Sequence, residues 1–344
     1  MISTATGYIR ESAIAFGEAW NEFWLRPSSA RPLAALRIGV GVLLLYWFVT
    51  FAPDLTTLFS ADGLLPSGSV DQWEQTGWGS TEAQQQLAFG DAYRRAQATS
   101  ENMSVLALCD APVELWTAWG VGVLAAILLI AGCFSRISAW IAWAMFLSFV
   151  NRAPMLSGPF EAVAAMLLFY LALAPCGLVC SFDRWRALRK PRTTIEAAEF
   201  NSVCHAPPRW SATVTLRLIQ VHLCAIYVLM ALAQWGGGGG ETPWATGEAI
   251  WLLAARPSSG LGFGWLASAP VLVDLWTHGM WLFTFTFPLL IWAKRARPAL
   301  IVLAGVVWFA FALLTGMYAF CLLMTVAGLA FWPFAAKQTA EAEI

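Results

Sequence analysis

Long apolar runs, separated by short polar or glycine-containing segments, dominate the pattern of this chain. A helix needs about 20 mostly apolar residues to cross the hydrocarbon core of a bilayer, and eight runs approach that length. We therefore predict an all-α fold, a polytopic transmembrane helical bundle of about eight spans. The predicted spans cover roughly residues 33–53, 112–132, 135–151, 160–178, 213–234, 270–293, 298–315 and 316–334.

The segment before the first span has a different pattern. Its apolar residues recur at helical spacing at Ile9, Ala13, Phe16, Trp20 and Phe23. This spacing predicts an amphipathic helix lying at the membrane interface, with a frayed tail as the alternative. A signal peptide is not expected, because a continuous apolar core is missing. The predicted organisation is an amphipathic N-terminal helix (1–27), a transmembrane domain (28–335) and a cytoplasmic tail (336–344).

The composition agrees with a membrane protein. The 344 residues are 59% hydrophobic and 12% charged, whereas soluble domains average about 45–50% apolar and about 25% charged residues. These values exclude a soluble globular enzyme, and a net charge of −1 gives no basic surface for nucleic acid. The 20 tryptophans suit the bilayer interface, where an apolar ring lies beside a polar N–H.

The positions of the basic residues predict the orientation. With eight spans, both termini lie on the same side of the membrane. Of the 20 Lys and Arg residues, 16 fall on that side, and the other side has four, which are Arg94, Arg95, Arg152 and Arg256. The positive-inside rule therefore predicts an integral inner (plasma) membrane protein of bacterial type, with cytoplasmic N- and C-termini.

Ionisable residues inside a bilayer cost about 2.5–3.5 kcal/mol on insertion scales, so each one is a functional candidate. Asp274 and His278 are four residues apart and share a helix face. The carboxylate can orient the imidazole for general acid–base catalysis. The alternative is a polar pair that joins two helices near the outer interface.

Three further polar residues have competing interpretations. His222 is placed to bind a cofactor head group or to form an interhelical hydrogen bond. Gln234, at the end of the fifth span, either contacts a ligand or is solvated at the interface. Arg37 is expected to extend toward the cytoplasmic surface, because the acid that could pair with it, Glu161, is predicted near the opposite side.

The cysteines give a weak metal hypothesis. Cys176, Cys180, Cys204 and His205 lie near one another on the predicted cytoplasmic side and carry the ligand types that zinc prefers. Their spacing matches no standard zinc motif, and the alternative is that the cysteines are apolar filler. We therefore predict no metal site.

Several short motifs together resemble one family. They read LRIGVG at 36–41, DGLLP at 62–66, NRAP at 151–154, LAPCG at 173–177, RLIQ at 217–220, ALAQW at 231–235 and TGMYAF at 315–320. In this order they resemble the horizontally transferred transmembrane domain (HTTM) family, which includes the membrane domain of vitamin K-dependent gamma-carboxylase. The resemblance covers roughly residues 28–335.

The resemblance implies a site for reduced vitamin K within the membrane domain, opening outward, with a lysine as the base. That lysine position falls on Gln234 here, and an amide does not accept a proton as an amine does. The assisting histidine position falls near Gly158 to Phe160, and a histidine common in bacterial members falls near Trp308. Gamma-carboxylase activity is therefore not expected, and any enzymatic activity would depend on Asp274 and His278.

Two functions remain as hypotheses. The first is binding of a quinone or lipid in an outward-facing cavity. The candidate ligand-binding residues are Gln234, Asn151, Arg152, His222, Gln220 and Arg37. The alternative is a non-catalytic membrane partner in the maturation or export of a secreted peptide, docking on the acidic outer loop 54–111.

Overall fold

The computed structural model describes residues 2–65, 106, 109–153, 156–189, 203–204, 206–236, 242–256, 259 and 264–332, and this part of the chain is helical with no strands. The helices are α1 (Ile2–Leu25), α2 (Arg31–Phe51), α3 (Leu55–Phe59), α7 (Pro112–Ala131), α8 (Ser135–Arg152), α9 (Pro159–Leu173), α10 (Phe182–Leu188), α12 (Trp210–Gly236), α13 (Ala249–Ala254), α14 (Pro270–Leu290), α15 (Arg297–Thr315) and α16 (Tyr318–Gly328). Three 3₁₀ turns, η3 (Cys176–Leu178), η4 (Gly264–Ser268) and η5 (Leu329–Phe331), join them.

Each predicted apolar run contains one α-helix, and the all-α prediction is confirmed for the described residues. Four helices are long and apolar enough to cross a membrane, namely α2, α7, α12 and α15. The apolar helices α9 and α16 are shorter, and α9 ends at Leu173, before the predicted boundary at 178, because Ala174 and Pro175 leave the helix. The chain is therefore a helical membrane protein, and the count of eight spans stays a prediction.

Glycines in the left-handed conformation end two of these helices. Gly132 closes α7 with φ 71°, and Gly316 closes α15 with φ 73°. Only glycine adopts this conformation without a steric penalty, so it is the usual residue after the last helical turn. The turn at Gly316 is the break expected between the last two apolar runs.

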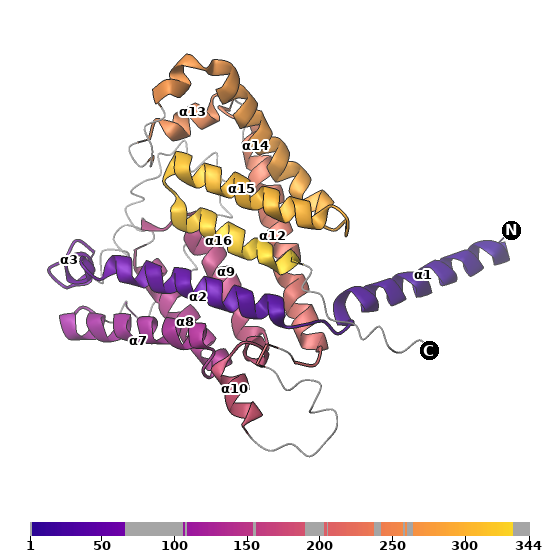
Figure 1. Cartoon of the computed structure of the whole chain (residues 1–344), viewed down its shortest axis with the longest axis horizontal. Coiled ribbons are helices and arrows are strands. Elements are labelled where there is room, and N and C mark those ends of the chain that lie inside the picture. Colours follow the sequence, from indigo (N-terminus) through magenta and orange to yellow (C-terminus); the bar gives the residue numbers. More distant parts are fainter. Residues whose placement is uncertain are drawn as a thin grey trace.

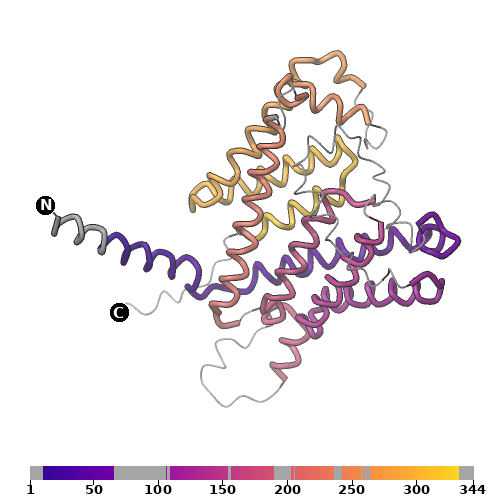
Figure 2. Tube along the Cα trace, turned by 180° about the vertical axis from the view of Figure 1, so that it is seen from behind, coloured from indigo at the N-terminus to yellow at the C-terminus, as the bar shows by residue number. Residues whose placement is uncertain are grey.

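The long helices form one bundle (Figure 1). Helices α2, α7, α8 and α9 pack against each other, α15 packs against α16, and α16 contacts both α2 and α9. Helix α12 runs across this set and packs along α14, which the view from behind also shows (Figure 2). The centre of the bundle is the line where α2 meets α9 and α16.

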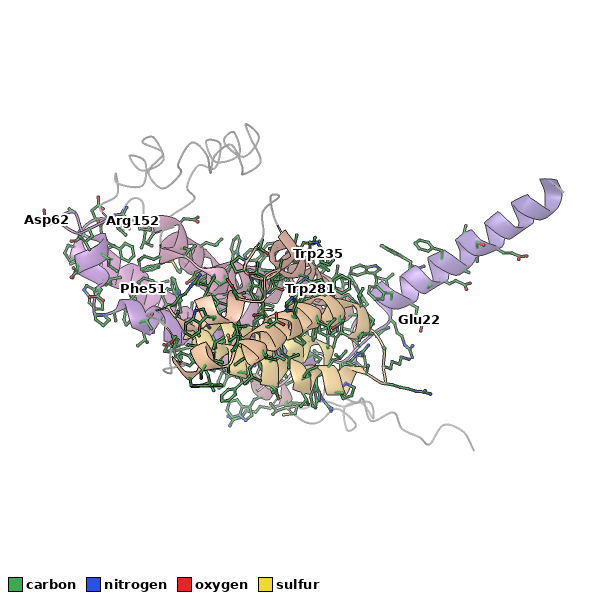
Figure 3. The ribbon with its side chains drawn as sticks, turned by 90° about the horizontal axis from the view of Figure 1, so that it is seen from above. Glu22, Phe51, Asp62, Arg152, Trp235 and Trp281 are labelled. Carbon is green, nitrogen blue, oxygen red and sulfur yellow. The ribbon has the colours of Figure 1, made fainter. Side chains whose placement is uncertain are left out.

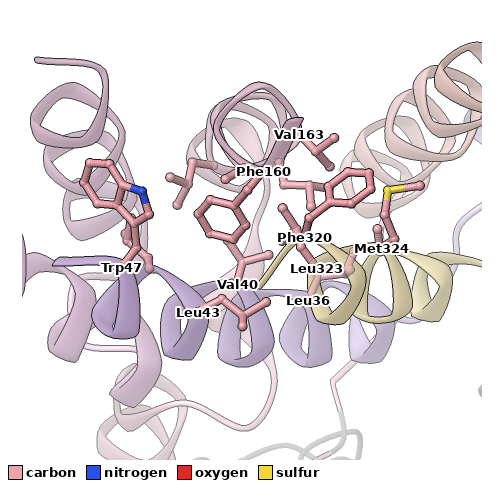
Figure 4. Close-up of a cluster of buried hydrophobic side chains, with 14 of the residues drawn as sticks. Leu36, Val40, Leu43, Trp47, Phe160, Val163, Phe320, Leu323 and Met324 are labelled. Carbon is pink, nitrogen blue, oxygen red and sulfur yellow. The ribbon is translucent and has the colours of Figure 1, made fainter. Parts of the chain in front are cut away.

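Tightly packed apolar side chains fill that centre (Figure 4). Val40 of α2 faces Phe160 of α9, and Leu36 of α2 lies beside Leu323 of α16. All four are buried, with exposed fractions of 1%, 6%, 0% and 0%. Interiors of this density leave few voids, so a ligand site is expected at the margin of the bundle.

Helix α1 projects away from the bundle (Figures 1 and 2). Its last turn is attached to the bundle, because Phe23 contacts Trp292 with ring centroids 5.7 Å apart. Large apolar side chains farther along α1, among them Phe16 and Trp20, are exposed. The segment is a helix, as the spacing predicts, and its position at a membrane interface stays a prediction.

Candidate ligand site

An apolar groove lies between α12 and α14. Its lining consists of Val228, Ala231, Leu232, Trp235, Trp281, Phe285 and Leu289. The α12 residues recur at intervals of three and four, and the α14 residues recur every four, so each helix contributes one face. The cavity has a volume of about 90 Å³ and is partly open.

Aromatic rings form most of one wall of the groove. The rings of Trp235 and Trp281 lie 5.1 Å apart, and Trp281 stacks on Phe285 at 5.7 Å with an angle of 13°. The Trp235 and Trp281 rings are tilted by 58°, so only Trp281 and Phe285 form a flat, stacked surface for an apolar ligand. The indole N–H of Trp281 is buried and has no hydrogen-bond partner among the described residues.

The groove lies between the two ends of the molecule (Figure 3). Trp235 and Trp281 are side by side, with Asp62 and Arg152 toward one end and Glu22 toward the other. The sequence predicts that these ends lie on opposite sides of the membrane. A ligand that reaches the groove would therefore be one that dissolves in the bilayer.

Gln234, one of the predicted ligand-binding residues, directly precedes the groove residue Trp235 and does not line the groove. The residue is 7% exposed, and its side-chain oxygen Oε1 accepts a hydrogen bond of 2.8 Å from the Thr284 hydroxyl. This bond joins α12 to α14 at residues adjacent in sequence to the groove residues Trp235 and Phe285. The structure thus gives Gln234 a packing partner, and its predicted contact with a ligand is not supported by the groove lining.

Arg152 ends α8 as a buried cation near the predicted outer surface. Its Nη2 atom donates to Asp110 Oδ1 at 2.7 Å and to the Phe59 carbonyl at 3.2 Å. The side chain is 1% exposed, whereas that of Asp110 is 36% exposed. This contact fixes α3 and the start of α7 against α8. The neighbouring candidate, Asn151, is half-buried.

Arg37 does not extend to the surface but is fully buried beside the end of α7. Its guanidinium donates to the carbonyls of Leu129 and Ile130, the latter at 2.9 Å, and to the Cys180 carbonyl at 2.7 Å. The last carbonyls of a helix have no partner within the helix and carry its negative dipole end. Arg37 therefore caps α7, and its predicted extension toward the cytoplasmic surface is wrong because these carbonyls retain it.

Gln220 and His222 also form interhelical contacts. Gln220 is buried, donates to the Ala330 carbonyl at 2.7 Å and accepts from Arg217 at 2.9 Å. His222 Nδ1 lies 3.1 Å from the Tyr170 hydroxyl of α9. Of the two interpretations of His222, the structure thus contains the interhelical hydrogen bond.

Asp274 and His278 form a pair on α14, as their spacing predicts. The imidazole Nδ1 lies 3.1 Å from Asp274 Oδ1, and the two side chains are 62% (Asp274) and 49% (His278) exposed. The carboxylate also lies against Gly247, where the Cβ atom of any other residue would collide with Asp274 Oδ1. Neither residue lines the groove, so a ligand bound there would not contact the pair.

The cysteine hypothesis is resolved only in part, because His205 lies outside the described residues. Cys180 and Cys204 have their sulfur atoms 3.0 Å apart. Burial, aided by the hydrogen bond to Cys204, raises the pKa of the Cys180 thiol to about 11, which keeps it protonated at neutral pH. Among the described residues, no group of three or more His, Cys, Asp or Glu side chains is arranged to hold a metal ion.

Sequence reasoning missed the groove itself. Trp281, Phe285 and Leu289 mark one face of α14 by their spacing of four, and Trp235 directly follows a candidate residue. That signal was present, but apolar residues on a spanning helix most often face lipid or the core. The polar residues singled out instead, such as Gln220 and Gln234, bond to other parts of the protein.

Comparison with known proteins identifies no relative, because no family model, curated protein or solved structure matches the chain. The proposed peptide-docking surface falls mostly on residues 66–105, and the cytoplasmic tail on 336–344, which all lie outside the described residues.

Proposed function

We propose that this chain is an eight-span inner-membrane protein of the HTTM type, with cytoplasmic termini. Its proposed function is to bind a quinone or lipid in the groove between α12 and α14. The single observation that carries the proposal is the groove itself, which has apolar walls and a tryptophan pair 5.1 Å apart. The HTTM assignment is supported by the order of the seven short motifs.

The position and chemistry of the groove favour a ligand that is already in the membrane. Leu232, Phe285 and Leu289 line the groove and are also exposed at the protein surface. Because these residues would contact lipid in a spanning helix pair, a ligand can enter sideways without crossing water. A water-soluble substrate would find no polar side chain among those that line the groove.

The size of the groove restricts what part of the ligand it can hold. Its volume of about 90 Å³ is smaller than the roughly 150 Å³ apolar cavity that accommodates benzene. The groove therefore holds the edge of a ring or a segment of an isoprenoid or acyl chain. The remainder of the ligand would extend along the exposed apolar surface of α12 and α14.

Gln234, which directly precedes the groove residue Trp235, does not supply the base that gamma-carboxylation needs. The carboxylase reaction needs a base that removes a proton from the hydroquinone. Gln234 carries an amide, which is not a base, and its side-chain oxygen already accepts a hydrogen bond from Thr284. Binding by shape and by aromatic contact needs no such base.

The experiment compares two leucine variants on α12. Leu232 lines the groove and is 62% exposed, whereas Leu229 does not line it and is 64% exposed. Leu232→Trp should fill the groove without overpacking the core, and Leu229→Trp is the matched control. The purified proteins would be extracted with organic solvent, and quinones and lipids would be quantified by mass spectrometry.

We expect one quinone or lipid species to be enriched in the wild type and in Leu229→Trp, and to be strongly reduced in Leu232→Trp. Equal amounts in all three proteins would contradict the proposal. Recovery of a stoichiometric polypeptide instead would favour the peptide-partner function. The topology is tested separately by a green fluorescent protein fused after residue 344, which should fluoresce because that terminus is expected in the cytoplasm.

A further inference from the structure

A second feature of the structure is a group of four cations where α1, α12 and the turn between α14 and α15 meet. Arg217 is in the second turn of α12, Arg297 begins α15, and Lys294 and Arg295 are exposed on the turn between α14 and α15. This region belongs to the predicted cytoplasmic side, and Lys294 follows Leu289, the last groove residue of α14, by five residues. Neither the groove nor its ligand uses any of these residues.

Arg217 is held firmly by neighbours from three elements. Its Nε atom donates to the Phe23 carbonyl at 3.2 Å, and its Nη1 atom donates to Gln220 at 2.9 Å. The guanidinium carbon lies 4.4 Å from the centre of the Phe23 ring and 5.8 Å from that of Trp292. Such cation–π contacts favour a desolvated guanidinium. Nη2 has no hydrogen-bond partner in the described structure.

Arg297 is positioned through the same tryptophan. Its Nε donates to the Ile291 carbonyl at 3.1 Å and its Nη2 to the Trp292 carbonyl at 3.3 Å, which leaves Nη1 without a partner among the described residues. Trp292 thus contacts one arginine with its ring and the other with its backbone. Both guanidinium groups therefore lie against the same residue.

No carboxylate neutralises this pair within the described elements that carry it. The sequence has no Asp or Glu from residue 206 to 236 or from 275 to 332. On the adjoining end of α1, Glu22 is engaged by Arg26 at 2.8 Å. Half-buried like charges without a counter-ion destabilise a fold, and an anion placed between them removes that cost.

We propose that Arg217 and Arg297 bind the phosphodiester of an anionic phospholipid from the inner leaflet, with Lys294 and Arg295 adding long-range attraction. Two guanidinium groups offer the donors that phosphate oxygens accept most strongly. Basic pockets between spanning helices on the cytoplasmic side are a known way to hold lipid head groups. The phosphate would accept from the two free nitrogens, Nη2 of Arg217 and Nη1 of Arg297.

The depth and the surroundings of the pair fit a lipid rather than free phosphate. Arg217 is four residues beyond the predicted start of its span, so it lies about 6 Å along the helix from that boundary. Leu290 at the end of α14 is exposed, does not line the groove and offers apolar surface for acyl chains. A soluble phosphate ion would use none of that surface.

The test measures phospholipid binding to the full chain in neutral detergent. Native mass spectrometry gives the dissociation constants of phosphatidylglycerol and phosphatidylcholine. We expect the wild type to prefer phosphatidylglycerol, and the double variant Arg217→Gln/Arg297→Gln to bind it at least about tenfold more weakly. The matched control is Arg186→Gln/Arg189→Gln, which removes two exposed charges, one on α10 and one directly after it, on the same predicted side.

Two outcomes of the binding experiment would overturn the proposal. One is an equal loss of binding in both double variants, which would indicate a diffuse effect of net charge. The other is displacement of phosphatidylglycerol by millimolar inorganic phosphate, which would indicate a soluble-anion site. The wild type alone gives a further check, since phosphatidylglycerol should raise its unfolding temperature more than phosphatidylcholine. An equal rise would contradict the proposal even if the variants failed to fold.

Discussion

Replacing Arg37 with methionine should destabilise the bundle without changing the length of any helix. The side chain is fully buried and donates to three carbonyls. Methionine has a similar length and is apolar, so it fills most of the space and forms none of these hydrogen bonds. The change therefore isolates the cap on the C-terminal end of α7.

The expected magnitude follows from counting which groups lose a partner. The Leu129 carbonyl keeps a second hydrogen bond, from the Gly132 N–H at 3.2 Å. The carbonyls of Ile130 and Cys180 lose the bonds that Arg37 donates, at about 2 kcal/mol each. Methionine also removes Nε of Arg37, which is buried without a partner among the described residues, and this regains about 2 kcal/mol. The net loss in the free energy of unfolding is about 2 kcal/mol.

The assay is unfolding by sodium dodecyl sulfate titration, followed by circular dichroism at 222 nm. Arg136→Met is the control, because Arg136 is an exposed cation four residues after Gly132. We expect the control to unfold like the wild type and Arg37→Met to lose about 2 kcal/mol. If Arg37→Met were as stable as the control, the guanidinium would not be the cap of α7, and the reasoning would be refuted.

Three further predictions concern other contacts. Gly132→Ala should destabilise the protein, because alanine would be held at a positive φ and its Cβ would meet the Arg37 guanidinium. The control Gly120→Ala, with no atom within 4 Å of its new Cβ, should be neutral or stabilising in the same titration. The variants Thr284→Val and Gln234→Leu should each cost about 1 kcal/mol and show a coupling energy in a double-mutant cycle, and strict additivity would contradict their hydrogen bond. Alkylation of Cys180 should accelerate with rising pH up to about 11, since only the thiolate reacts, and a plateau near pH 9 would contradict the raised pKa.

The sequence was a good guide to the helices, because their apolar runs and glycine breaks are local features. The break at Gly316 is an example, since Thr315 ends α15 and Tyr318 begins α16. The early end of α9 is also local in origin, but Ala174 and Pro175 are apolar and extended the predicted run. Membrane crossing depends on the bilayer as well as the helix, so only part of the predicted topology can be checked from lengths and composition.

The site was less predictable, because polar residues in a membrane protein often bond to distant backbone groups. Arg37 and Cys180 are 143 positions apart, and Gln220 and Ala330 are 110 apart. No local pattern shows such partners in advance. The Asp274 and His278 pair was found because it lies within one helical turn.

The most direct test of the central claim is a cryo-electron microscopy map of the wild type in nanodiscs made with native lipid extract. Our account predicts elongated density in the groove between α12 and α14, against Trp235 and Trp281 and continuous with density along the exposed face of Leu232. Mass spectrometry of the same sample should identify that density as a quinone or lipid. A well-resolved groove closed by its own side chains, with no such density, would contradict the account.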